Sequence, residues 1–471
     1  MIRIASILNF CLTLCLSVST EGSAQDKPNI VFIMADDLGY GDIGAYGQQF
    51  IQTPNLDRMA SEGLTFTQHY AGTSVCAPSR CVLMTGLHTG HSEIRANKEF
   101  APNGQLPLSD SAVTIATVLK NNGYHTGLIG KWGLGEFGTS GDPIRHGFDF
   151  FYGYTDQVLA HNHFPEFLLR NGKKELLNNT VRYLDSNAWH KGRGSVTTRK
   201  MDFADELFTQ EAIRFIERNK DQPFFLYLPY IIPHDNGEAE EGSRFEAPTQ
   251  LHYKNKSGWT KDEKDYAASI TYLDQYVGRI LNYLKKAGIA RNTLVIFTSD
   301  NGPATDRFRF NSSGGLRGIK RDLYEGGIRV PFVTWWPGTI TAGTTTNHIS
   351  TFYDFFATAS ALVGAADIPA TDGISFLPVL LGRQQESHPY IYFEIHEQSG
   401  GQALRKGDWK LVLNNVKNES PNAPELYNLA KDPQESGNVA SDNPELVREM
   451  LDGIKTARTP SKMFPMPEDQ L

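Results

Sequence analysis

Acidic side chains stand directly after two stretches that read as buried strands. Asp36 and Asp37 follow the run NIVFIM, and Asp300 and Asn301 follow the run TLVIFT. In open α/β sheets, ligands gather beyond the carboxyl ends of the strands. Carboxylate and amide oxygens suit Ca²⁺ or Mg²⁺, and no cluster of Cys and His suggests zinc. Each pair alone is compatible with an ordinary turn, but two pairs at strand ends predict a metal site.

A cysteine stands in a short motif with proline and arginine at fixed offsets. The motif is CAPSR over residues 76–80. At a helix start, Cys76 would meet backbone N–H groups that favour anions, and Pro78 fits a first helical turn. Arg80 would place a permanent cation nearby. A buried structural cysteine remains the alternative on these residues alone. A helical rise of about 7.5 Å to Cys81 exceeds the usual disulfide span, so at least one of the two thiols is expected to have another purpose.

Short apolar runs alternate with amphipathic stretches, which predicts an α/β fold. We expect strands over residues 29–34, 125–130, 223–228, 293–298 and 330–335. We expect helices over residues 53–62, 112–122, 203–219, 264–287 and 350–363. After Leu381, short strands and a closing helix over 443–457 predict a smaller subdomain. We therefore divide the chain into a catalytic domain over 25–381 and an antiparallel-sheet subdomain over 382–471.

The N-terminal segment is typical of an export signal. Arg3 precedes an apolar stretch over residues 4–18, and the small residues Gly22, Ser23 and Ala24 end it. A short membrane anchor is the alternative, but the stretch falls short of the ~20 residues that a bilayer span needs. We predict a signal peptide over 1–24, a periplasmic or extracellular protein, and no stable membrane insertion.

Composition excludes two broad classes of protein. The 471 residues include 27 Phe and 19 Tyr, enough aromatic side chains to build a large core and to exclude wholesale disorder. The formal net charge of −8 argues against a nucleic-acid partner, because such proteins carry a basic surface. An anionic substrate must therefore be met by a local cluster of cations.

Taken together, these motifs resemble the formylglycine-dependent sulfatase family, arylsulfatase-like proteins of the alkaline phosphatase superfamily. CAPSR matches the family motif C-x-P-S-R. Further blocks match in order over residues 29–37, 53–63, 123–132, 299–302, 316–331 and 426–440. The resemblance runs from about Pro28 to Ala440. It implies a large mixed β-sheet sandwiched between helices, with a smaller C-terminal antiparallel sheet.

The resemblance also implies a role for each matching residue. Cys76 would be oxidised to formylglycine by a separate maturating enzyme and would reach the metal. Arg80 would hold the aldehyde hydrate. His234 would protonate the leaving oxygen after one hydroxyl attacks sulfur, and the second hydroxyl would expel sulfate. The Ca²⁺ ligands would be Asp36, Asp37, Asp300 and Asn301. Contacts to the sulfate and the bridging oxygen would come from Lys131, His234 and Lys320.

One position departs from the family pattern. The family reads Gly-Lys-Trp-His-Leu-Gly, whereas Gly133 stands here in place of the histidine. That imidazole normally touches the hydroxyl of the nucleophile, so His161 or His163 is expected to fill the gap, unless both only line a loop. Arg95 is a candidate contact to a sugar carboxylate or hydroxyl. The basic run over 189–200 is either a solvated face or a contact to an anionic polysaccharide.

The residues and the resemblance together predict an exported, Ca²⁺-dependent sulfatase that acts on a sulfated carbohydrate. One alternative is a phosphodiesterase or phosphonate monoester hydrolase of the same superfamily, which can share the metal site. The other is a catalytically inactive glycan-binding protein, motivated by Gly133.

Overall fold

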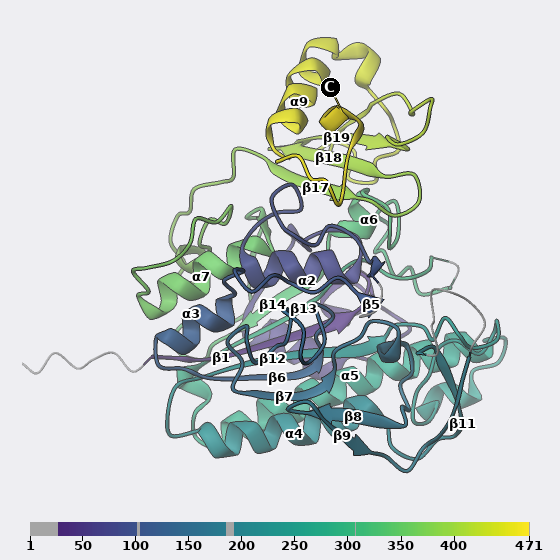
Figure 1. Ribbon diagram of the computed structural model, residues 1–471, viewed down its shortest axis with the longest axis vertical. Helices are drawn as coiled ribbons and strands as arrows, with labels where there is room; N and C mark the ends of the chain where they lie inside the picture. Colours follow the sequence, from purple (N-terminus) through teal and green to yellow (C-terminus); the bar gives the residue numbers. More distant parts are fainter. Residues whose placement is uncertain (1–26, 101–103, 185–192, 307, 471) are drawn as a thin grey trace, which may run out of the picture.

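A mixed ten-stranded β-sheet forms the centre of the computed structural model, which describes residues 27–100, 104–184, 193–306 and 308–470 (Figure 1). The predicted signal peptide lies outside these ranges. Across the sheet, the strands are β15 (Thr344–Thr346), β2 (Leu64–Phe66), β14 (Phe332–Trp335), β13 (Thr293–Ser299), β1 (Asn29–Asp36), β12 (Phe224–Pro233), β6 (His125–Lys131), β7 (Phe150–Tyr154), β8 (Phe167–Arg170) and β9 (Lys173–Leu176).

The five middle strands, from β13 to β7, run parallel to one another. Every residue of β1 is buried, as expected for a strand covered on both faces. The five predicted strands are all present, which confirms the α/β prediction. β12 continues past the predicted end at Leu228 to Pro233, so His234 directly follows it.

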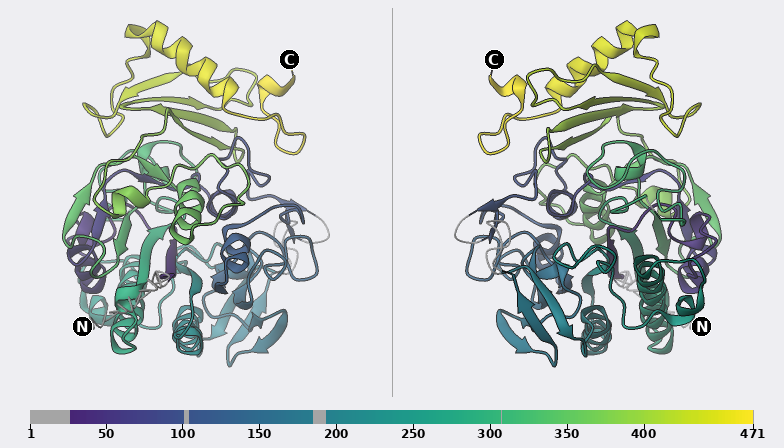
Figure 2. Two further views of the ribbon diagram at one scale, coloured as in Figure 1. Left: turned by 90° about the vertical axis from the view of Figure 1, so that its left-hand side faces the viewer. Right: turned by 90° about the vertical axis from the view of Figure 1, so that its right-hand side faces the viewer.

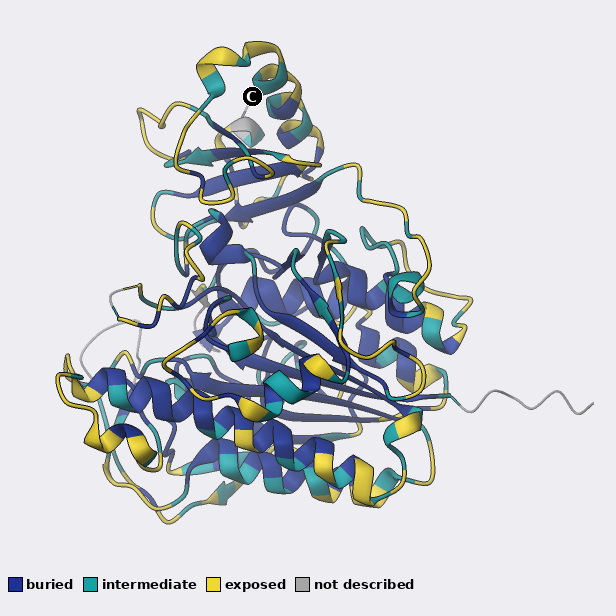
Figure 3. Cartoon of the chain, turned by 180° about the vertical axis from the view of Figure 1, so that it is seen from behind, coloured by how far each residue is buried: buried dark blue, intermediate teal, exposed yellow. Residues whose placement is uncertain are grey.

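Helices cover both faces of this sheet (Figures 1 and 3). Their inner faces are buried in two separate cores. Their outer faces carry the exposed residues, except in the helix that begins at Cys76, where every residue is buried. The longest helix begins with a capping box, in which Oγ1 of Thr260 accepts from the N–H of Glu263 over 3.2 Å and Glu263 accepts from the N–H of Thr260 over 2.7 Å. One face carries α2 (Cys76–Thr85), α3 (Ile115–Asn121) and α7 (Tyr353–Val363), and the other α1 (Pro54–Ser61), α4 (Ala204–Asn219) and α5 (Lys261–Lys286).

The C-terminal part is an antiparallel sheet with one helix on it (Figure 2). Alternate side chains face opposite sides of a strand. Tyr392 and Leu404 pack against the helix, whereas Phe393 and Ala403 join the core of the main body. The C-terminal sheet therefore packs against the main body through one of its two faces. Its elements are β17 (Ile391–Ile395), β18 (Gly401–Lys406), β19 (Trp409–Asn414), β20 (Glu425–Asn428) and α9 (Pro444–Thr456).

None of the described helices is long and apolar enough to cross a membrane.

Short elements complete the described part of the chain. The paired short strands are β3 (His69–Tyr70) with β16 (Ser350–Thr351), β4 (Glu99–Phe100) with β5 (Gly104–Gln105), and β10 (Thr180–Tyr183) with β11 (Ser195–Arg199), and the short helices are α6 (Glu325–Ile328) and α8 (Leu377–Leu380).

Candidate active site

The predicted metal ligands meet at one edge of the sheet, because β1 and β13 lie side by side in parallel register. Asp36 ends β1, and Asp300 follows the end of β13. Asp37 adopts a left-handed φ of 63°, which costs a non-glycine residue about 1–2 kcal/mol. Its N–H donates to Oδ1 of Asp300 over 3.1 Å, so this turn is held to the neighbouring strand.

Asn301 provides the strongest indication of a cation. Its Nδ2 donates to Oδ1 of Asp37 over 2.7 Å and to the carbonyl of Gly302 over 2.8 Å. Its Oδ1 is buried without a hydrogen-bond partner, although buried polar atoms nearly always have one. With the carboxylates of Asp36, Asp37 and Asp300, this oxygen forms an all-oxygen donor set that fits Ca²⁺.

Arg80 ties the two strand ends together. Its side chain is fully buried, and Nη2 lies 3.1 Å from Oδ2 of Asp36 and 2.7 Å from Oδ2 of Asp300. Nη1 donates to the carbonyl of Lys131 over 2.7 Å. Although burial opposes the charge, the two carboxylates hold the pKa of this guanidinium above its usual value. These contacts make Arg80 a positioning residue, and its contact to an aldehyde hydrate stays a prediction.

Two buried lysines complete the set of cations. Nζ of Lys131, at the end of β6, lies 2.7 Å from Oδ2 of Asp36. Nζ of Lys320 lies 2.7 Å from Oδ2 of Asp37. Together with Arg80, these cations equal the carboxylates in number, so they leave no excess positive charge for an anionic substrate. A bound divalent cation would supply that excess.

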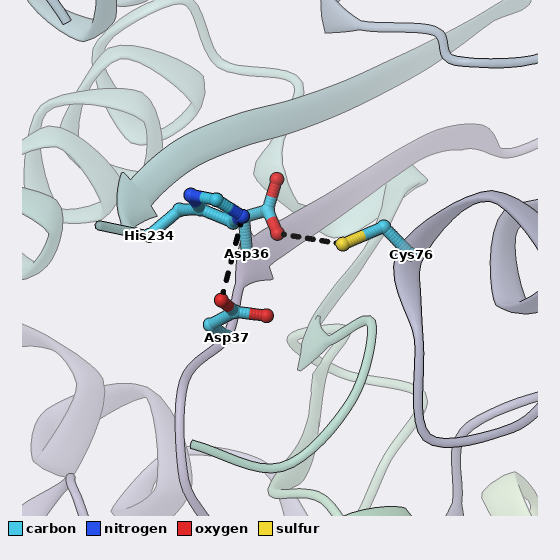
Figure 4. A group of neighbouring side chains, drawn as sticks. All are labelled: Asp36, Asp37, Cys76 and His234. Atoms are coloured by element: carbon cyan, nitrogen blue, oxygen red, sulfur yellow. Dashed lines mark hydrogen bonds and ion pairs between the residues drawn. The ribbon is translucent and has the colours of Figure 1, made fainter. Parts of the chain in front are cut away.

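Cys76 begins α2 and points towards the carboxylates (Figure 4). Its Sγ lies 3.4 Å from Oδ1 of Asp36, and the residue is 2% exposed. Burial, together with the charge of Asp36, raises the pKa of this thiol. This raised pKa opposes the anion that the helix start was expected to favour. Cys76 and Cys81 are both unpaired, in agreement with their expected helical separation.

His234 is a neutral imidazole in this arrangement. Its Nδ1 lies 2.6 Å from the carbonyl of Asp235 and therefore donates. Its Nε2 lies 3.1 Å from Nζ of Lys320, and an ammonium group can only donate. Burial and the charge of Lys320 hold the pKa of His234 well below its usual value. Nε2 thus accepts from Lys320 in this arrangement, and the transfer of a proton from His234 to the leaving oxygen stays a prediction.

A cavity of about 820 Å³ opens over these groups. This volume is typical of sites for small ligands. Ligand atoms of Asp36, Asp37, Cys76 and His234 lie within 4.8 Å of one another beneath it (Figure 4). Among the predicted residues, those that line the cavity are Cys76, His161, His234 and Lys320, with Gly133 beside them.

Arg95 is not among the residues that line this cavity. Its side chain is 5% exposed, and Nη1 lies 3.2 Å from Oε1 of Glu394. It also donates to the carbonyls of Thr459 and Ser92, over 3.1 and 2.9 Å. The structure thus places Arg95 away from the cavity lining, and its contact to a substrate stays a prediction. Arg95 holds the loop after α2 to the C-terminal part, because a buried guanidinium needs a buried carboxylate.

Two of the three described cations of the predicted basic run are paired with carboxylates. Arg193 pairs with Asp156 over 2.9 Å and with Glu136 over 3.2 Å. Lys200 pairs with Glu246 over 2.5 Å. Neighbouring carboxylates thus neutralise these two cations, whereas Arg199 is exposed, and residues 185–192 lie outside the described ranges.

The two candidate histidines differ in position. His161 lines the cavity. His163 is buried behind it, with Nε2 2.8 Å from the carbonyl of His234, and supports the backbone there. Sequence reasoning missed Gln157, which lines the cavity next to Gly133. It also missed Asn97, whose Oδ1 accepts from the N–H that follows Cys76 over 2.9 Å. Neither lies in a motif.

Comparisons with known proteins agree with this geometry. A family model described as Sulfatase matches residues 28–365, and one described as N-sulphoglucosamine sulphohydrolase, C-terminal, matches residues 319–459. The chain is 30% identical over 513 residues to the N-acetylgalactosamine-6-O-sulfatase of Bacteroides thetaiotaomicron, covering 93% of this chain and 94% of that protein. It is 33% identical over 484 residues to arylsulfatase A of Homo sapiens, covering 93% and 89%.

A solved structure, Ps i-CgsB in complex with k-i-k-neocarrahexaose, matches with a TM-score of 0.72 and 26% identity over 92% of each chain. The chain therefore belongs to the sulfatase family. This membership confirms the predicted enzyme class, a sulfuric ester hydrolase, and the alkaline phosphatase-like fold.

Proposed function

We propose that this sulfatase hydrolyses sulfate monoesters on sulfated glycans, using Ca²⁺ and a formylglycine formed from Cys76. The observation that carries the proposal is the buried Cys76, with Sγ 3.4 Å from Oδ1 of Asp36 in an all-oxygen site where Oδ1 of Asn301 lacks a partner. The names of two relatives support a glycan, because one is an N-acetylgalactosamine-6-O-sulfatase and the other was solved with a neocarrahexaose.

The residues at the base of the cavity would act chiefly through charge. Bound Ca²⁺ would neutralise sulfate charge, and formylglycine would supply one hydroxyl for attack on sulfur and another for product release. Lys131 and Lys320 are held in place by Asp36 and Asp37, so they would meet the sulfate oxygens without reorganising. His234 accepts from Lys320 and orients that ammonium group.

Maturation and export are part of the same proposal. A maturating enzyme would oxidise Cys76, the cysteine with proline and arginine at the family offsets. The chain would act in the periplasm or outside the cell, after removal of residues 1–24. Neither a phosphoryl-transfer enzyme nor an inactive glycan-binding protein is favoured, because the matching family model and the curated relatives are sulfatases.

The test is sulfate release by protein produced together with the maturating enzyme. We expect hydrolysis of at least one sulfated mono-, oligo- or polysaccharide and none by Cys76→Ala. Relative rates on matched phosphate esters serve as the comparison. An aldehyde-bearing, Ca²⁺-loaded chain that releases phosphate but no sulfate would rule out the proposal.

A further inference from the structure

The cavity wall beside Gly133 is built by the segment that follows β7. Gly133 has a left-handed φ of 77°, and a Cβ placed on it would lie 2.0 Å from Nε2 of Gln157. That amide also donates to the carbonyl of Gly133 over 3.4 Å. The space for a side chain at position 133 is therefore occupied. An imidazole that serves this site must come from another position on the wall.

His161 lies on the same segment and is held by a buried carboxylate. It ends a short 3₁₀ helix, η2 (Leu159–His161). Its Nδ1 lies 3.1 Å from both carboxylate oxygens of Glu238, whose side chain is 1% exposed. An ionised carboxylate only accepts hydrogen bonds, so Nδ1 carries a proton. Glu238 thereby fixes the ring, as the aspartate of a serine-hydrolase triad fixes its histidine.

This pairing leaves Nε2 of His161 available to the cavity. Within the described ranges, Nε2 has no hydrogen-bond partner, and the side chain is 16% exposed. The ring lies parallel to that of His234, with centroids 5.0 Å apart and planes at 14°. His234 differs, because its Nε2 already accepts from Lys320. Of the two stacked imidazoles, His161 is the one whose Nε2 has no partner among the described residues.

Resting on the proposed sulfatase function, we propose that His161 is the general acid for the leaving group and that Glu238 is its positioning residue. As the bond between sulfur and the sugar oxygen breaks, the electron pair stays on oxygen. The Nε2 proton of the His161 imidazolium moves to that oxygen, so a neutral alcohol leaves. The neutral ring then regains a proton from water, and the Glu238 carboxylate balances the imidazolium charge.

Two esters with different leaving groups test this assignment. A sugar alcohol needs a proton to leave, whereas an acidic phenol does not. In Ca²⁺-loaded enzyme carrying formylglycine, Glu238→Gln and His161→Gln should each lower kcat on a sugar sulfate by about 10²-fold or more. KM on the sugar sulfate, and kcat on an aryl sulfate, should stay within about threefold of the wild-type values. Glu240→Gln is the matched control, since Glu240 is an exposed carboxylate of the same segment that does not line the cavity, and it should change neither kcat nor KM.

The possible results separate the two proposals. An equal loss on both esters, or no loss on the sugar sulfate, would overturn the role of His161 while sulfatase activity stands. Aldehyde-bearing wild-type enzyme that hydrolyses neither ester would overturn the proposed function itself.

A measurement without turnover tests the pairing directly. Nitrogen NMR of the Cys76→Ala variant, which cannot form formylglycine, should show a protonated Nδ1 in His161. Adding Glu240→Gln should preserve that resonance, and adding Glu238→Gln should shift it. An unchanged resonance in the Glu238→Gln chain would contradict positioning by Glu238.

Discussion

Each carboxylate at the end of β1 and β13 is paired with a lysine or arginine, yet Oδ1 of Asn301 has no partner. A cation that binds this oxygen must also be coordinated by the same carboxylates. Asp36→Ala and Asp300→Ala should therefore abolish sulfate release, because each removes a charged oxygen ligand. Chelation should inhibit the wild type, and Ca²⁺ should restore it. Asp110→Ala, at an exposed site, is the control. Rescue by zinc but not by calcium would contradict the assignment.

Gly133 gives a second prediction at the scale of single residues. Any side chain there meets Nε2 of Gln157 and must adopt a left-handed φ. Gly133→Ala should lower the free energy of unfolding by about 1–2 kcal/mol from the backbone alone, plus a steric share. When Gln157→Gly is added to Gly133→Ala, denaturant titrations should show that only the steric part of the lost free energy of unfolding is recovered. Full recovery would show that the backbone conformation is not strained.

At the scale of elements, the start of α2 depends on a residue distant in the sequence. The N-cap residue of α2, Val75, offers no side-chain cap, and Oδ1 of Asn97 accepts from the N–H of Ala77 instead. Asn97→Ala should lower the free energy of unfolding by about 1 kcal/mol, the usual cost of a lost cap. Chemical denaturation measures this, with the exposed Asn282→Ala as control. Equal losses in both variants would contradict a capping role.

The difference between local motifs and tertiary contacts explains which features the sequence predicts. Strand ends place Asp36 and Asp300 because parallel neighbours share an edge, and hydrophobic runs mark those strands. Glu238 was not predicted, because its pairing with His161 joins segments 77 residues apart. The pairing of Arg95 with Glu394 was not predicted for the same reason, since the two residues stand 299 positions apart. Side-chain partners across such separations leave no local pattern.

At the scale of the whole molecule, the C-terminal sheet shares one face with the main core and is also joined to it by buried charges (Figure 2). Glu394 of β17 pairs with Arg95 over 3.2 Å and with Arg458 over 3.0 Å. Lys410 of β19 pairs with Glu325 of α6 over 3.0 Å. Since α6 follows Lys320 closely in the chain, these pairs also hold the segment that carries a cation of the active site.

Glu394 makes this joint sensitive to acid. Burial alone would raise its pKa, but the hydrogen bond from His396 and the charge of Arg95 lower it from 4.5 to about 2. Its contribution to stability is complete above about pH 4.5 and is lost as the pH falls towards 2. Glu394→Gln should lower the free energy of unfolding by about 3–5 kcal/mol at neutral pH. Its deficit against the wild type should shrink below about pH 4.5.

Denaturant titrations from neutral to acidic pH test this dependence. Glu449→Gln, at an exposed pair with Lys406, should change stability by at most about 1 kcal/mol. A deficit of Glu394→Gln that stays constant down to about pH 3 would show that Glu394 does not titrate with a lowered pKa.

The central claim is that Cys76 is the precursor of the nucleophile, and peptide mass spectrometry tests it most directly. Preparations with different degrees of maturation should show an aldehyde at Cys76 and never at Cys81. Their kcat on a sulfate ester should rise in proportion to the aldehyde fraction. Full activity in a chain whose Cys76 is unmodified, or bonded to Cys81, would contradict the account.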